Sequence, residues 1–102
     1  MGEVLRFERP ADKPVREEPL WREAVGGQLR EERAARSERL TDVAGRAGVS
    51  TQYLSELERG LKEPSSEVLA ALAGALRLSV ADLTSRAVER LTAVRGPVCL
   101  AA

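Results

Sequence analysis

The chain has 102 residues, of which 43% are hydrophobic and only three are aromatic, and its 16 basic side chains balance 16 acidic ones. This length allows one domain with a single small core, which Leu, Val and Ala must fill. With no His and one Cys, the sequence offers no metal site, no internal disulfide and no nucleophile–base pair for an enzyme. No apolar run reaches the roughly 18–20 residues of a membrane span, and none resembles a signal peptide. We therefore expect a cytoplasmic, cofactor-free protein that is not an enzyme.

Residues 1–20 hold three of the five prolines among alternating charges, and no apolar period survives there. Because proline breaks helical hydrogen bonding, we expect a flexible N-terminal arm. From Trp21 onward apolar residues recur at helical spacing, which predicts a first helix over about 21–36. The pair Gly26-Gly27 weakens this helix, since each glycine costs about 1 kcal/mol relative to Ala.

Two short helices are predicted next, joined by a tight turn. Residues 40–47 place apolar side chains on one face, and Gly48 ends this helix because a turn with positive φ favours glycine. Ser50 is a good N-cap for a third helix, which runs to Arg59 and ends at Gly60.

Two longer helices follow. The run Pro64-Ser65-Ser66-Glu67 is typical of a helix start, and the apolar stripe of this fourth helix extends to Leu76. Ser79 and Asp82 have the spacing of a capping box and open a fifth helix, which Gly96-Pro97 would stop. With no convincing strand, the sequence predicts an all-α domain.

The turn at Gly48 has the steric pattern of a helix-turn-helix, the unit that many small proteins use to place side chains in the major groove of DNA. Ala44 is small where the third helix crosses the second, and Val49 fills the space beneath the turn. Leu54 and Leu57 are expected to anchor the third helix to the core. The side chains left facing outward are Thr51, Gln52, Ser55 and Glu56. A recognition helix needs this division between anchored and exposed residues.

Residues 25–83 resemble the Cro/C1-type repressor domain of phage repressors and many bacterial regulators. The motifs that carry the resemblance are Val49-Ser50, Tyr53-Leu54-Ser55, Glu58-Arg59-Gly60, Pro64-Ser65 and Leu72-Ala73. A narrower run, residues 53–67, is similar to actinobacterial activators of Clp-protease genes. The resemblance implies a five-helix fold like that of lambda repressor, with double-stranded DNA as the partner and a palindromic operator.

Carried over by position, the resemblance implies two sets of DNA-binding residues. The expected base-reading residues are Thr51, Gln52, Ser55 and Glu56. The expected phosphate-binding residues are Ser50, Tyr53, Arg59, Lys62 and Arg39. The resemblance also implies that Arg33 pairs with Glu58 inside the domain.

Three positions depart from the family pattern. Arg39 and Leu40 stand where Thr and Gln often cap the second helix and hold a phosphate, so we expect that cap to be lost. Glu32 occupies a commonly apolar place in the first helix, so we expect a thinner core edge there.

The apolar stripe of the fifth helix has two interpretations, because it either completes the core or forms a dimer interface. We favour a homodimer, since a monomer contacts only one half-site of a palindrome. The residues of this expected interface are Val80, Leu83, Ala87, Leu91 and Val94.

The chain is therefore expected to have three parts: a flexible arm (1–20), a helix-turn-helix domain with a C-terminal dimerisation helix (21–95) and an apolar tail (96–102). The ending Leu100-Ala101-Ala102 resembles the apolar C-terminal tags that Clp-type proteases recognise. It is either a degradation signal, which would make Clp protease a partner, or a featureless tail.

We thus expect a dimeric, sequence-specific transcriptional regulator, favoured as an activator of Clp protease or stress genes. The alternatives are a repressor or antitoxin of the same fold, or a protein-interaction module that has lost DNA binding.

Overall fold

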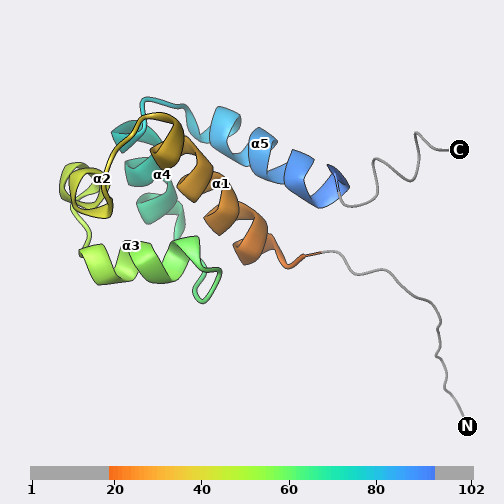
Figure 1. The fold of residues 1–102 in the computed structure, drawn as a ribbon. Helices are drawn as coiled ribbons and strands as arrows, with labels where there is room; N and C mark the ends of the chain where they lie inside the picture. Colours follow the sequence, from red (N-terminus) through yellow and green to blue (C-terminus); the bar gives the residue numbers. More distant parts are fainter. Residues whose placement is uncertain (1–18, 94–102) are drawn as a thin grey trace, which may run out of the picture.

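Five helices follow one another along residues 19–93, the part of the chain that the computed structural model describes (Figure 1). They are α1 (Trp21–Ala35), α2 (Leu40–Ala47), α3 (Thr51–Glu58), α4 (Ser66–Ala75) and α5 (Val80–Ala93). The prediction of an all-α, five-helix fold is confirmed. Val94, the tail and nearly all of the arm lie outside the described residues, so the expected role of the tail as a degradation signal stays a prediction.

Serine side chains begin three of the helices, as the sequence predicts. The hydroxyl of Ser50 accepts a hydrogen bond from the backbone N–H of Tyr53 at 3.0 Å. The same bond joins Ser65 and Ser79 to the backbone three residues further on, at 3.2 and 2.9 Å. Each bond satisfies one of the donors that a helix N-terminus leaves unpaired.

The N-terminus of α2 is capped in a different way. Arg39 has no side-chain acceptor, but its backbone N–H donates to the Asp42 carboxylate at 2.9 Å. This bond holds the pKa of Asp42 below its usual value. A capping box has two hydrogen bonds, and this is the one in which the side chain of the third helical residue accepts from the backbone N–H of the N-cap residue. Asp42 therefore replaces part of the helix cap that is lost because Arg39 has no side-chain acceptor.

The core draws apolar residues from all five helices. α1 packs against α3 and α5, and α2 packs against α3 and α4, so α1 runs between α3 and α5 (Figure 1). Trp21 is half-buried against this core. The largest fully buried side chains are Val25, Leu29, Val43, Leu54, Leu57, Leu72, Leu76 and Leu83.

α1 approaches the end of α3 closely because Gly26 has no side chain. A Cβ at this position would lie 2.1 Å from the carbonyl oxygen of Leu57 and 2.9 Å from that of Glu58. Both are backbone atoms, so neither can rotate away as a side chain would. The glycine that weakens α1 as an isolated helix therefore allows the α1–α3 contact.

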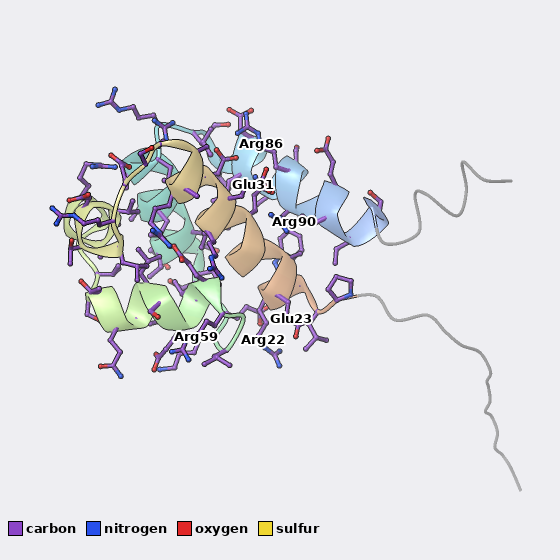
Figure 2. All side chains as sticks on the ribbon, in the orientation of Figure 1. Arg22, Glu23, Glu31, Arg59, Arg86 and Arg90 are labelled. Carbon is purple, nitrogen blue, oxygen red and sulfur yellow. The ribbon has the colours of Figure 1, made fainter. Side chains whose placement is uncertain are left out.

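A polar network joins α1 to α5 beside the apolar core. Glu32, which is 9% exposed, accepts hydrogen bonds from the Gln28 amide at 2.7 Å and from the Arg86 guanidinium at 2.6 Å. Arg90 donates to the side-chain oxygen Oε1 of Gln28 at 2.9 Å and also pairs with Glu31. Figure 2 shows Glu31, Arg86 and Arg90 where α1 and α5 face each other. The core edge at Glu32 is thus filled by hydrogen bonds and ion pairs.

The protonation of Glu32 is set by this network. Burial raises the pKa of Glu32, but the hydrogen bonds from Arg86 and Gln28 more than offset it, so the pKa lies below its usual value. The carboxylate form therefore stabilises the fold above the unfolded-state pKa. That contribution is lost as the pH falls through the lower folded-state pKa.

We expect the variant Glu32→Gln to lose less free energy of unfolding than the wild type when the pH falls from about 6 to about 3, because glutamine takes up no proton. Urea unfolding at both pH values measures the difference. Glu63→Gln is the matched control, since this side chain is exposed and belongs to none of the ion pairs formed within residues 19–93, and it should follow the wild type. Equal pH dependence for Glu32→Gln and the wild type would contradict the assignment.

We expect Gly26→Ala to lower the free energy of unfolding by about 3 kcal/mol or more, because α1 and α3 must move apart to admit the methyl group. Gly74→Ala in α4 is the control, since a Cβ there meets no atom within 4 Å. It should be neutral or stabilising by up to about 1 kcal/mol. Urea unfolding measures both, and a Gly26→Ala variant as stable as the wild type would show that the close approach is not required.

Candidate nucleic-acid interface

α2, the following turn and α3 form a helix-turn-helix. Gly48 has a φ of 77°, and its N–H and that of Val49 both donate to the Ala44 carbonyl oxygen, at 2.9 and 3.1 Å. A Cβ on Gly48 would meet nothing within 4 Å. The turn therefore requires glycine for its left-handed backbone conformation and not for space.

The residues predicted to build this unit are buried as expected. Ala44, Leu54 and Leu57 are each 1% exposed, and Val49 packs half-buried against them and the rest of the core. The steric interpretation of the sequence is confirmed at these positions.

The outward side of α3 carries the four expected base-reading residues. At about 100° per residue they fall within an arc of about 140°, opposite the two anchoring leucines. Thr51 and Gln52 are exposed, whereas Ser55 and Glu56 are half-buried. Exposure is thus greatest at the N-terminal turn of α3, the part of a recognition helix that comes closest to base edges. Base reading itself stays a prediction.

Glu56 and Lys62, to which the sequence assigns separate DNA contacts, form an ion pair. Lys62 Nζ lies 3.0 Å from a carboxylate oxygen of Glu56 and 5.9 Å from the centroid of the Tyr53 ring. The hydrogen bond from Lys62 lowers the pKa of Glu56, and one from Gln52 adds to the effect. The charge of Lys62 is therefore compensated within the domain, and the Glu56 carboxylate already has a donor.

Three other expected phosphate-binding residues have different surroundings. The Arg39 side chain is 84% exposed, with its Nε 3.7 Å from Asp42. Arg59 is exposed near the end of α3, and its Nε lies 3.4 Å from the Ser55 carbonyl oxygen. The Ser50 oxygen caps α3, so its hydroxyl hydrogen is left to donate to a phosphate.

An ion pair fixes α3 on α1. Arg33 donates to both carboxylate oxygens of Glu58, at 2.8 and 2.9 Å, and also to the Glu38 carbonyl oxygen at 3.0 Å. The Glu58 side chain is only 6% exposed. The pairing of Arg33 with Glu58 that the resemblance implies is confirmed, and its two parallel bonds restrict rotation of α3.

The structure corrects the expected dimer interface at two positions. Leu83 and Ala87 are fully buried in the core of the chain itself, so neither has surface to offer a second copy. Both face inward because the α5 stripe closes the core beside α1 and α4. Leu91 is half-buried and Val80 is 40% exposed.

Two exposed or partly exposed side chains were not predicted from the sequence. Val88 is 46% exposed, and its spacing of eight residues from Val80 is the signal that could have identified it. Arg22 donates from Nε to the Gly60 carbonyl oxygen at 3.1 Å, a contact that no local pattern in the sequence indicates.

Residues 19–93 contain neither a metal-binding cluster nor a single membrane-spanning helix. No group of three or more His, Cys, Asp or Glu residues there could hold a metal ion. No single helix in this segment is long and apolar enough to cross a membrane, although α4 and α5 together reach the required length and hydropathy across a 99° bend.

Residues 29–83 match the model of the helix-turn-helix family. The transcriptional regulator ClgR of Mycobacterium tuberculosis (strain ATCC 25618 / H37Rv) is 47% identical over 72 residues, which are 71% of this chain and 64% of that relative. The chain thus spans somewhat less than two thirds of the length of this relative.

Solved structures share the fold. The clp gene regulator ClgR from Corynebacterium glutamicum matches with a TM-score of 0.75 and 46% identity, covering 83% of this chain and 90% of that one. The restriction-modification controller protein C.Esp1396I, solved as a tetramer with its natural 35 base-pair operator, has a TM-score of 0.66 at 16% identity, covering 72% and 97%. The chain therefore belongs to the helix-turn-helix family of Cro/C1-type proteins and, within it, resembles the clp gene regulators.

Proposed function

We propose that this protein is a sequence-specific transcriptional regulator that binds a palindromic operator as a dimer and activates Clp protease or stress genes. The proposal rests chiefly on the exposed N-terminal turn of α3, which Leu54 and Leu57 hold on the core. The names of the ClgR relatives support the choice of target genes. Activation is preferred to repression because residues 53–67 resemble activators.

In this proposal Gln52 reads adenine, because its amide can donate to N7 and accept from N6–H, a pairing worth about 1–3 kcal/mol of discrimination. Thr51 offers a methyl group to thymine and a hydroxyl to a base edge, and Ser55 offers a second hydroxyl. Glu56, whose Oε1 pairs with Lys62, can accept from cytosine N4 through a free acceptor site. The residues proposed to hold phosphates are Ser50, Tyr53, Arg39, Arg59 and Lys62.

For the dimer we propose a contact along the exposed flank of α5. Val80, Thr84, Val88 and Leu91 fall within an arc of about 80° on the helix surface, on one side of the buried stripe. The two valines are 40% and 46% exposed. A two-fold axis would place this strip against its own copy, because a two-fold interface uses the same patch on both subunits.

We expect Gln52→Ala to lose about 1–3 kcal/mol of preference at one base position in each half-site while nonspecific affinity is largely kept. Arg59→Ala is the paired variant from the same helix, and it should weaken all sequences alike and lower the salt slope by about 1. Selection from a random duplex library and titrations at several salt concentrations separate the two effects. If both variants changed binding in the same way, the division into base-reading and phosphate-binding residues would be wrong.

We expect Val88→Asp to shift the protein towards monomer, because it places a charge in the proposed apolar contact. Its affinity for a duplex with two half-sites should fall, while affinity for a single half-site stays close to that of the wild type. Sedimentation equilibrium and DNA titration measure these quantities. Ser85→Asp adds the same charge to an exposed position of α5 outside the strip, so a similar loss in this control would point away from the proposed interface.

A further inference from the structure

Arg22, in the first turn of α1, lies against the C-terminal end of α3. Its Nε donates to the Gly60 carbonyl oxygen at 3.1 Å. Gly60 is buried, with a φ of 76°, and a Cβ on it would lie 3.1 Å from the Cα of Glu23. The start of α1 and the end of α3 are therefore held together at backbone distance. Figure 2 shows Arg22 and Arg59 on the same side of the molecule, below this end of α3.

The charges around this end of α3 set Arg22 apart from Lys62. Lys62 is paired with Glu56 at 3.0 Å, and Arg33 is paired with Glu58. Within residues 19–93, neither Arg22 nor Arg59 forms an ion pair with a carboxylate. The neighbouring acid, Glu23, accepts a hydrogen bond from the backbone N–H of Leu20 at 2.9 Å.

The length of α3 is close to the width of the major groove. Eight residues span about 12 Å, and the major groove of B-form DNA is also about 12 Å wide. If the N-terminal turn of α3 lies at the base edges, its C-terminal end therefore reaches the phosphates that border the groove. Arg22 lies at that end, outside the segment 29–83 that matches the family.

We propose that Arg22 is a phosphate-binding residue. The Gly60 carbonyl oxygen holds the guanidinium through Nε, and the terminal NH₂ groups donate to a phosphate that borders the site contacted by α3. The tether reduces the side-chain entropy lost on binding, and a planar guanidinium can bond a phosphate with two N–H groups at once. This inference rests on the proposed DNA-binding function.

The test measures the affinity of the full chain for a short duplex of random sequence and for a selected site, each at several salt concentrations. Arg22→Gln should weaken both several-fold and reduce the salt slope by about 0.9 for each bound subunit, the value for one lost phosphate contact. Arg22→Lys should keep the slope and recover part of the affinity, because lysine binds phosphate as a point charge.

Arg77→Gln is the matched control, because it removes the same charge from an exposed residue between α4 and α5, on the other side of the molecule from α3 (Figure 1). It should leave the slope unchanged. Thermal unfolding of each variant reports on folding separately. An Arg22→Gln variant with the wild-type slope overturns the proposal whether or not its stability falls, and so does an equal change in Arg77→Gln. A wild-type chain that binds neither duplex would instead refute the proposed function.

Discussion

The contact between α1 and α3 holds the exposed face of α3 in its orientation. It combines a close backbone approach at Gly26 with the two-bond ion pair between Arg33 and Glu58. The glycine sets how near the two helices come, and the paired bonds set how α3 is rotated about its axis. Since residues three or four apart differ by only about 60° or 40° around a helix, a rotation of that size would replace Thr51 or Gln52 on the outward face by another residue. The rest of the proposed interface depends on this orientation.

α5 contacts the rest of the domain through an apolar face and a polar face, and its remaining face is exposed. Leu83 and Ala87 complete the core, and Arg86 and Arg90 bind acidic and amide groups of α1. The guanidinium groups of this flank are therefore paired within the chain. The opposite flank exposes Val80 and Val88, and this is the surface proposed for the dimer contact.

The helices and the helix-turn-helix could be predicted from the sequence because their determinants are local. Caps, glycine turns and apolar spacing act within a few residues of each other. The structure was needed where a partner lies far along the chain, as for the carbonyl groups that face Gly26. It was also needed to show that the α5 stripe is consumed by the core at Leu83, since periodicity marks an apolar face without saying what covers it. The pairing of Glu56 with Lys62 was equally beyond prediction, because several cations lie within reach in sequence.

The Glu56–Lys62 pair changes what the balanced charge of this domain means for binding. A phosphate that takes Lys62 releases condensed counterions from the duplex, but it also leaves the Glu56 carboxylate unpaired. If that carboxylate attracts a cation from solution, this uptake offsets the ions released. The contribution of Lys62 to DNA affinity would thus hardly vary with ionic strength. When Lys62 exchanges Glu56 for a phosphate, sequences that present a base amino group to the free Glu56 carboxylate would be favoured. A cation that is already neutralised inside the protein contributes little to the nonspecific attraction of DNA and more to the discrimination between sequences.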